Sequence, residues 1–471
     1  NQSDLAGTGA TQVNANTVTV PANIVTASIT FNGRAGADSL EVDRTGGDPT
    51  LGLGLAWNGG DPAVNPGDIL TFTNGTVTTT TINYTDANSG NVEVDGIVHT
   101  FTELEDRATG SVITSTLASS NVVLNYSTTA ETIEVTDDAG STKVTSASAA
   151  STTFANPTTL LTLNAGDTGD DIINVTSLPA SYPAAVSING QGGTDTININ
   201  GAVSTNGTDI TLAAESVTTT ATVAAGAGSI SITTDAIAIG ATVSGTDTLT
   251  IAPQTATTTI GLGGAAGTLS LDDAELAFLT DGFSAITIGD TAAGTGTVTI
   301  DTATFSDPVT IAGGFINDAT GADIVAGTNA VTLQGTVAPG AAGGAASGIL
   351  NVTGNLTLAA NDTFAVEIGG TSPGELATTH DQLNVTGTVT IGANVTLSTS
   401  QLNGFNPTDG QQFTIIENTS ANAVSGTFNG LAEGALIPNF LGTSTGATIS
   451  YVGGTGSNDV VLTALAPTTT V

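Results

Sequence analysis

Two aspartates, Asp171 and Asp195, stand at the same place in two copies of a repeated sequence element. The element reads G-x-x-G-x-[DN]-x-[ILV], and the two copies are GDTGDDIIN from residue 166 and GQGGTDTIN from residue 190. A third copy, GRAGADSLE from residue 33, contains Asp38, and a fourth, GGTGSNDVV from residue 453, contains Asn458 instead of an aspartate. Glycines followed by a polar and then an aliphatic residue are typical of a tight turn that leads into a strand.

A calcium site is one chemistry that this spacing allows. If Asp171 and Asp195 occupy equivalent turns of successive repeats, their carboxylates lie one strand spacing apart, about 5 Å. Two anions at that distance repel each other unless a proton or a cation lies between them. Calcium binds about six to eight oxygen atoms, which the two carboxylates, turn carbonyls and Asp167 or Asp170 could supply. Asp167, Asp170, Asp171 and Asp195 are therefore candidate metal ligands, and Asp38 is a further candidate in an isolated copy.

A purely structural interpretation of the same aspartates stays open. Aspartate side chains in turns often hydrogen-bond the backbone of their own turn, with water between neighbouring turns. This interpretation is favoured for Asp38 and for Asn458 with Asp459, which are isolated copies.

The charge of the chain points to cations as partners. Only 10% of the 471 residues are charged, yet the net charge is −38, from 42 acidic and 4 basic side chains. Nucleic acids and anionic membrane surfaces repel such a chain. There is no cysteine, which excludes disulfides and thiol catalysis, and no apolar run long enough to insert into a membrane as a helix.

Alternating hydrophobic residues predict an all-β chain. In residues 228–251 and 387–400, aliphatic side chains recur at every second position with Thr or Ser between many of them, which is the period of strands with one buried face. Antiparallel sandwiches in a row or a parallel β-helix could result. The first glycines of two copies, Gly166 and Gly190, lie 24 residues apart, which suits one coil of a β-solenoid. We therefore predict a parallel β-helix.

One short helix is expected to interrupt the strands. In SLDDAELAFLTDG, Ser270 followed three residues later by Asp273 resembles a capping box, and Gly282 would end the helix. This segment places a domain boundary near residue 265. The expected organisation is a β-solenoid region with Gly-Asp turns at 1–265, a second β-solenoid region at 266–464 and a tail at 465–471.

The C-terminal part resembles a known group of proteins. DQLNVTGTVTIGANVTL, DGQQFTIIENTS, VSGTFNGLAEGALI and ATISYVGGTGSNDVVLTA resemble the endings of haemagglutinin-like and autotransporter-passenger-like bacterial exoproteins. The resemblance covers roughly residues 265 to 464 and implies a secreted, right-handed β-helix at the bacterial cell surface that acts as an adhesin, coat or fibre. The Gly-Asp turns of the N-terminal half are also similar to calcium-binding RTX repeats, although RTX turns follow one another in nine-residue tandem and these do not.

Catalysis is not expected from this chain. Glycoside hydrolysis needs two carboxylates a few ångströms apart on one surface, and the adjacent pairs are Asp137–Asp138, Asp170–Asp171 and Asp272–Asp273. Neighbouring residues on a strand point to opposite faces, which disfavours all three pairs as catalytic dyads.

The sequence thus predicts a non-enzymatic extracellular structural protein that assembles with copies of itself into a fibre, sheath or surface layer, stabilised by divalent cations such as Ca²⁺. One alternative is a monomeric adhesin domain that binds a glycan or a host surface, for which the loop that begins at Trp57 is the candidate binding site. A second alternative is a β-helix polysaccharide hydrolase.

Overall fold

The computed structural model describes residues 11–14, 17–19, 25–60, 67–104, 111–127, 130–340 and 346–466. The chain divides into two compact units, Asn1–Asp209 and Ile210–Val471. The boundary that we expected near residue 265 lies inside the second unit, because strands on either side of it pair with one another: β26 (Thr248–Ala252) with β29 (Ala285–Ile288).

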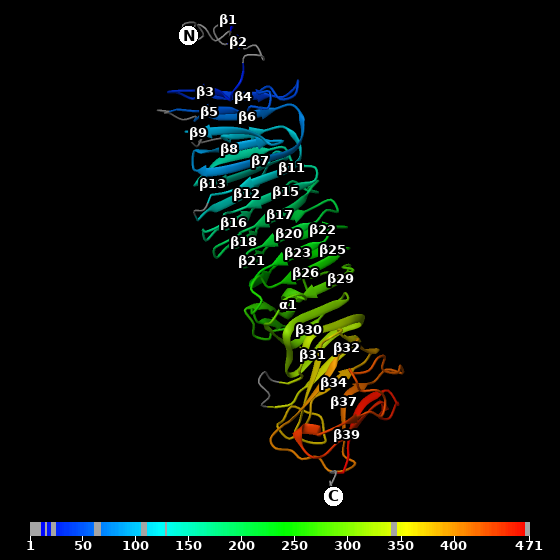
Figure 1. Cartoon of the computed structure of the whole chain (residues 1–471). Helices are drawn as coiled ribbons and strands as arrows, with labels where there is room; N and C mark the ends of the chain where they lie inside the picture. Colours follow the sequence, from blue (N-terminus) through cyan, green and yellow to red (C-terminus); the bar gives the residue numbers. More distant parts are fainter. Residues whose placement is uncertain are drawn as a thin grey trace. The chain divides into compact units, whose positions relative to one another are not determined.

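The first unit consists of strands joined by turns and loops (Figure 1). Its strands are β1 (Thr11–Asn14), β2 (Thr17–Thr19), β3 (Ile29–Asn32), β4 (Ser39–Asp43), β5 (Leu55–Asn58), β6 (Ile69–Thr73), β7 (Thr76–Asp86), β8 (Ser89–Val94), β9 (Ile97–Thr102), β10 (Ile113–Ser115), β11 (Ala118–Asn125), β12 (Thr132–Asp138), β13 (Ser141–Ser146), β14 (Ala149–Phe154), β15 (Leu160–Asn164), β16 (Ile172–Val175), β17 (Ala185–Asn189), β18 (Thr196–Ile199) and β19 (Val203–Ser204).

From β3 to β18, the chain of the first unit crosses back and forth between two sheets. One sheet contains β3, β5, β7–β9, β11, β15 and β17, and the other contains β4, β6, β10, β12–β14, β16 and β18. Strands that return to the same sheet pair in parallel, as β15 does with β17 and β16 does with β18 (Figure 1). Each sheet also contains one antiparallel three-stranded meander, β7–β8–β9 or β12–β13–β14.

Alternation builds the core of this unit. In β17, Val186 and Ile188 are buried while Ser187 between them faces outward, and in β18 Ile197 and Ile199 are buried. Since parallel strands are in register, the buried residues of one strand stack on those of the next.

Four asparagines form a row on the outward face of the sheet that contains β7, β8, β11 and β15. Asn164 donates from Nδ2 to Oδ1 of Asn125 at 2.8 Å, and Asn125 donates in the same way to Asn83 at 2.7 Å. Asn83 in turn donates to Asn91 of the β8 meander strand at 2.8 Å. The side chains therefore form a continuous chain of amide hydrogen bonds along the sheet.

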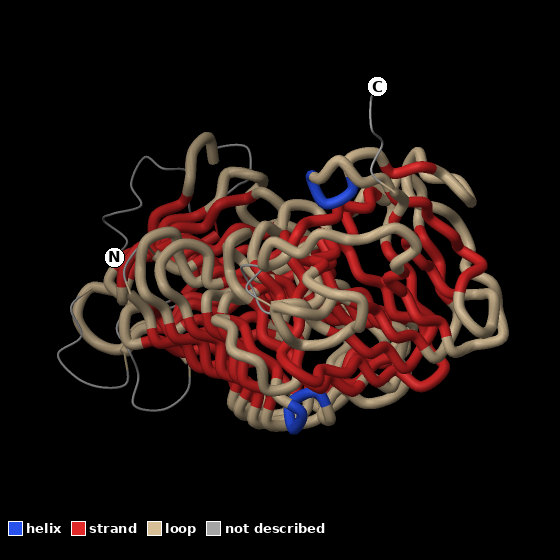
Figure 2. Tube along the Cα trace, turned by 90° about the horizontal axis from the view of Figure 1, so that it is seen from below, coloured by secondary structure: helices blue, strands red, loops and turns tan. Residues whose placement is uncertain are grey.

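The second unit is also nearly all β, and the two short helices among its described residues are the blue segments in Figure 2. Its elements are β20 (Ile210–Ala213), β21 (Ser216–Thr219), β22 (Val223–Gly226), β23 (Ile230–Thr233), β24 (Ala236–Ile239), β25 (Val243–Gly245), β26, β27 (Ile260–Leu262), β28 (Leu269–Leu271), α1 (Asp273–Leu276), β29, β30 (Thr297–Thr304), β31 (Val309–Val337), β32 (Ile349–Leu358), β33 (Thr363–Ile368), β34 (Gln382–Val385), β35 (Val389–Ile391), β36 (Thr396–Gln401), β37 (Gln412–Asn418), β38 (Leu436–Ile437), η3 (Phe440–Gly442), β39 (Ala447–Gly453) and β40 (Asp459–Ala464).

Two runs of parallel pairs in the second unit each keep a constant spacing along the sequence. The strands β20, β21 and β22 pair with β23, β24 and β25, and each residue pairs with the one 20 positions later, apart from a one-residue shift in β22–β25. Further along, β32 pairs with β34 and β35, and β33 with β36, with a spacing of 33 residues. The series ends in antiparallel pairing, where β37 and β39 flank β40.

The expected helix is present but shorter than its pattern, and it is capped differently. Asp272, not Ser270, caps α1: its side chain accepts the Glu275 N–H at 2.9 Å, and the Glu275 carboxylate accepts the Asp272 N–H at 3.0 Å. The capping residue is therefore two positions later than predicted, since Ser270 still belongs to β28. In the described part of the chain, no helix is long and apolar enough to span a bilayer.

Candidate functional site

The repeated glycine turn places an aspartate in the interior of the protein. Asp195 is completely buried, and its Oδ1 accepts the backbone N–H of Asp171 at 2.9 Å. A Cβ atom at Gly190 would lie 2.4 Å from the Asp195 carboxylate, so only glycine leaves room for this side chain. Gly193 has a φ of +141°, which side chains rarely tolerate. The two glycines of this copy thus shape the turn around the carboxylate.

The same hydrogen bond recurs one strand earlier. The fully buried Asp171 accepts the Glu131 N–H at 2.6 Å, and Glu131, Asp171 and Asp195 directly precede β12, β16 and β18 in the same register. Each carboxylate therefore accepts a hydrogen bond from the turn of the neighbouring strand. This corrects the structural interpretation of the sequence, in which each aspartate would bond its own turn.

Asp38 belongs to a second place of this kind. It precedes β4, and its N–H donates at 2.7 Å to Oδ1 of Asp68, which precedes the neighbouring strand β6. Asp68 is fully buried although no G-x-x-G element precedes it. Asp38 therefore lies beside Asp68 in the described structure, among other strands than those that follow Asp171 and Asp195.

Two aspartates of the second unit repeat the arrangement, and sequence analysis missed both. The Gly348 N–H donates at 2.8 Å to Asp381, which precedes β34, and the Gly335 N–H bonds the carboxylate of Asp362, which precedes β33. The shared signal is an aspartate directly before a strand, in the pattern D-x-Φ-x-Φ, where Φ is an apolar residue. We call these residues the strand-start aspartates: Asp38 (DSLEV), Asp68 (DILTF), Asp171 (DIINV), Asp195 (DTINI), Asp362 (DTFAV) and Asp381 (DQLNV).

Burial raises the pKa of three of these carboxyl groups, Asp171, Asp362 and Asp381. Burial and, to a smaller extent, the nearby carboxylates of Asp195, Glu131 and Asp170 raise the pKa of Asp171 to about 6, although the Glu131 N–H bond acts in the opposite direction. Burial also raises the pKa of Asp381 to about 8. A buried anion without a cation beside it is costly, so Asp381 keeps its proton into the neutral pH range, whereas Asp171 keeps its proton only up to about pH 6.

The predicted calcium ligands do not all face one point. Asp167 and Asp170 are exposed, and Asp170 accepts the Thr194 N–H at 2.8 Å, whereas Asp171 and Asp195 point inward. Among the described residues, no group of three or more acidic or histidine side chains is arranged to hold a metal ion. The outward residues of the turn are thus the ones that a cation from solution can reach.

The remaining sequence candidates have structural surroundings. Trp57 is 5% exposed in β5, where it stacks in register between Phe31 and Phe101, so it is not the exposed aromatic that a glycan site needs. Residues 61–66 of its loop lie outside the described residues. Asn458, in the fourth copy, lies in the hairpin turn between β39 and β40 and donates to the Asn418 carbonyl at 2.8 Å.

In each of the three adjacent aspartate pairs, the two carboxyl groups have different surroundings or contacts. Asp170 is exposed while Asp171 is buried, and Asp272 caps α1. Asp137 accepts the Gly140 N–H at 2.8 Å in the β12–β13 hairpin. These contacts give one member of each pair a structural role.

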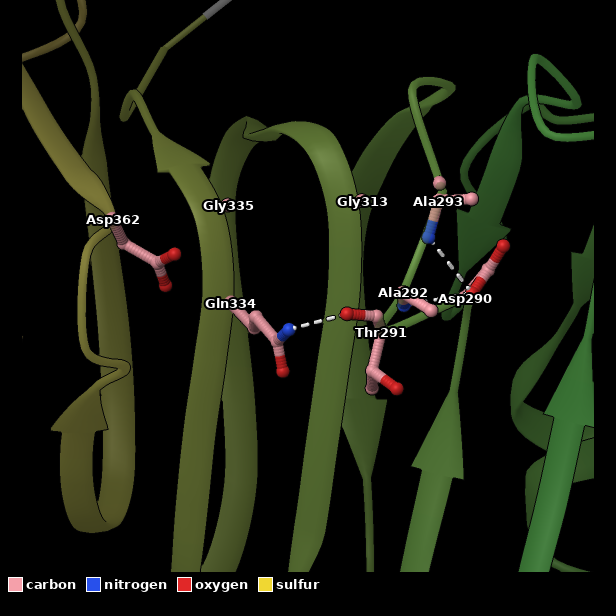
Figure 3. A pocket seen from close by; sticks show the side chains of 9 residues that line it. Asp290, Thr291, Ala292, Ala293, Gly313, Gln334, Gly335 and Asp362 are labelled. Atoms are coloured by element: carbon pink, nitrogen blue, oxygen red, sulfur yellow. Dashed lines mark hydrogen bonds between the residues drawn. The ribbon is translucent and has the colours of Figure 1, made fainter.

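A small polar pocket lies next to Asp362 in the second unit (Figure 3). Gln334 donates there to the Thr291 carbonyl at 2.7 Å, and Asp290 accepts the Ala293 N–H at 3.1 Å. The pocket measures about 120 Å³, whereas pockets for organic ligands usually start at about 300 Å³.

The glycine turn makes a first prediction. Gly190→Ala should lower the free energy of unfolding by about 1–3 kcal/mol, because the new Cβ displaces Asp195 from the Asp171 N–H. Urea unfolding measures this change. Gly46→Ala is the matched control, since a Cβ there meets nothing within 4 Å; equal stability of the two variants would contradict the function of Gly190.

Comparisons with known proteins found no relatives. No family model, no curated protein and no solved structure matches the chain. The resemblance to bacterial surface exoproteins therefore stays a prediction.

Proposed function

We propose that the chain forms a right-handed β-helix and serves outside the bacterial cell as a self-assembling subunit of a fibre, sheath or surface layer. The alternation between two sheets in the first unit, interrupted by one meander in each sheet and with parallel returns in register, supports the helix. Parallel crossovers are right-handed in nearly all proteins, which supports the handedness. Stacked strands of this kind form a stiff body that is suited to a mechanical role.

The observation that carries this proposal is a sheet edge that is unpaired among the described residues. Within the described residues, β3 pairs only with β5, and β4 pairs only with β6. Phe31 of β3 is 39% exposed, although its register neighbour Trp57 is buried. Unpaired strand edges attract further strands. A second copy of the chain is therefore the natural partner of this edge.

Flat outer faces offer a further surface for association. Five outward residues of the second unit lie in one register row without a charged side chain: Thr211, Ser231, Thr250, Thr287 and Thr310. Small hydroxyl side chains in register leave the face even, so that copies can approach closely.

Divalent cations would offset the repulsion between copies. Residues 210–471 contain 20 of the 42 acidic side chains and no Lys or Arg. Positive charge must therefore come from solution if these units pack together. Calcium is suited to this function, and exposed carboxylates such as Asp167 and Asp170 are within its reach.

Electron microscopy of the purified chain, with calcium and with chelator, tests the proposal. Ordered filaments or sheets in calcium that disperse in chelator are the expected result. If only isolated particles are seen with calcium and with chelator, at every protein concentration tested, self-assembly is ruled out.

A substitution at the open edge makes a second prediction. Phe31→Lys should raise the protein concentration needed for assembly roughly tenfold or more, because a buried unpaired charge costs at least about 1.4 kcal/mol per contact. Light scattering against concentration measures this threshold. Phe315→Lys is the matched control, since Phe315 is 54% exposed on β31, which is paired on both sides. An unchanged threshold for Phe31→Lys would exclude the edge.

A further inference from the structure

A histidine lies in the core of the first unit without a hydrogen bond. His99 in β9 is completely buried, and neither of its ring nitrogens has a hydrogen-bond partner among the described residues. Its ring packs against Phe72 of the opposite sheet, with 5.2 Å between the two ring centroids. In the β8–β9 pair, the residue opposite His99 is the buried Val92. The imidazole thus serves as an apolar core side chain, although it is the side chain that most readily takes up a proton just below neutral pH.

The loop of residues 44–54, between β4 and β5, lies against the strand of His99. A Cβ atom at Gly54 would be 1.9 Å from the carbonyl oxygen of Val98, the residue before His99. Hydrogen bonds hold the loop in place: the Gly54 N–H donates to Thr50 Oγ1 at 3.2 Å, and Thr50 Oγ1 donates to Asp48 at 2.7 Å. Because the ring is completely buried, water reaches it only after a neighbouring segment moves, and this loop is the neighbour that lies outside the sheets.

The charges near His99 form a pair of opposite sign. Arg44 Nη1 lies 3.5 Å from Asp48 Oδ1, and the two side chains are 8% and 15% exposed. Burial lowers the pKa of His99 to about 4, while Asp48 opposes this shift and Arg44 adds to it. Among the described residues, these two are the charged groups that act on His99, and β6 and β8 present the uncharged Phe72 and Val92. Burial therefore decides the protonation state of the ring.

We propose that His99 is an acid-sensitive lock of the first unit: uncharged, it fills the core between β6 and β9, and when protonated it leaves the core past the loop of residues 44–54. A buried imidazolium without a hydrogen-bond acceptor is costly, whereas the same charge in water is not. The neutral ring therefore holds the loop and the neighbouring strands closed, and a proton opens them. This lock does not rest on self-assembly.

The direction of the pH effect follows from the two states. The unfolded chain protonates His99 below about pH 6.5, whereas the folded unit does so only below about pH 4. The stabilisation is thus fully present above about pH 6.5 and is lost progressively as the pH falls toward 4. Asp48 stays ionised in this range, because hydrogen bonds from Thr50 and Gly52 outweigh burial and lower its pKa below 3.8. Asp171, whose pKa burial raises to about 6, acts in the opposite direction, so wild type and a His99 variant must be compared at each pH.

Urea unfolding of wild type and His99→Leu at pH 7 and pH 5 tests the lock. Trp57 reports on the first unit, since it is the only tryptophan and is buried in β5, which pairs with β9. The unfolding equilibrium constant of wild type, divided by that of His99→Leu, should rise roughly tenfold or more from pH 7 to pH 5. His380→Leu is the matched control, because it removes the other histidine, in the second unit, and should leave the Trp57 transition with its wild-type pH dependence. An equal pH dependence of wild type and His99→Leu would overturn the lock.

Nuclear magnetic resonance keeps the proposal testable even if His99→Leu does not fold. The chain has two histidines, so His380→Leu protein with ¹³C-labelled histidine shows His99 alone. Its ring signal should stay that of a neutral imidazole at pH 5, and it should become that of an imidazolium only where the native Trp57 fluorescence is lost. Titration of this signal near pH 6.5, with native Trp57 fluorescence retained, would overturn the lock. Both readouts use dispersed protein, so failure of the lock and failure of self-assembly remain distinct.

Discussion

Replacing both Asp171 and Asp195 with alanine is expected to lower the free energy of unfolding of the first unit by about 2–5 kcal/mol. The two substitutions leave the backbone N–H groups of Glu131 and Asp171 buried without their acceptors, and each such loss costs about 1–3 kcal/mol. Urea unfolding followed by Trp57 fluorescence measures the change, because Trp57 lies in the core of this unit.

Repeating this measurement in calcium and in chelator separates the two interpretations of these residues. If the carboxylates only accept hydrogen bonds, the loss is the same in both conditions. If they bind calcium, wild type gains stability in calcium and the alanine variant does not. The Asp171→Asn and Asp195→Asn pair keeps an acceptor oxygen and removes the charge, so it should stay within about 1 kcal/mol of wild type. Wild-type stability of the alanine pair would contradict the hydrogen-bonding role.

Phe413→Ala should lower the free energy of unfolding of the second unit by about 3–5 kcal/mol, the usual cost of removing a buried aromatic ring. Phe413 in β37 is completely buried, and its ring centroid lies 5.7 Å from that of His380 and 5.8 Å from that of Phe440. Phe413 lies where parallel pairing gives way to the antiparallel pairing of β37 with β40 and of β40 with β39. The cavity left by Phe413→Ala would remove packing contacts beside the last parallel strands.

Calorimetry measures this loss, and Phe315→Ala provides the control. Phe315 is 54% exposed, so its truncation should change stability by no more than about 0.5 kcal/mol. We also expect Phe413→Ala to aggregate on heating more readily than Phe315→Ala, since opened strand edges pair with other chains. Similar stability losses in the two variants would contradict the importance of this aromatic cluster.

Strand positions were predictable because burial and alternation coincide. Ile230 and Ile232 are buried and Ser231 between them is not, as the pattern of residues 228–251 requires. The all-β prediction is therefore confirmed, with long parallel sheets. The antiparallel meanders were not predicted, although the dipeptide Asp95-Gly96 offered a signal, because Asp-Gly is typical of two-residue hairpin turns. In the structure both residues have positive φ in the hairpin between β8 and β9.

The candidate site was predictable only where a local pattern marks it. The glycines around Asp171 and Asp195 signalled a turn with a special side chain, and both aspartates lie in it. Asp381 was missed because its partner Gly348 is 33 residues away, and only the register of the folded strands brings the two together. Residue propensity and motif spacing do not indicate such a contact. The pattern D-x-Φ-x-Φ, with an aspartate directly before an alternating strand, does indicate a strand-start aspartate.

The asparagine row of the first unit has a consequence for folding errors. Strands rich in Thr and Val can slide past one another by two residues without turning any side chain to the wrong face. Such a slip would place Asn164 opposite Val123 instead of Asn125, and an amide would lose its partner in the half-buried row. Each asparagine therefore helps to specify the strand register, because a shifted strand loses an amide hydrogen bond. The correct alignment is thus more stable than a shifted one in a chain whose repeats otherwise look alike.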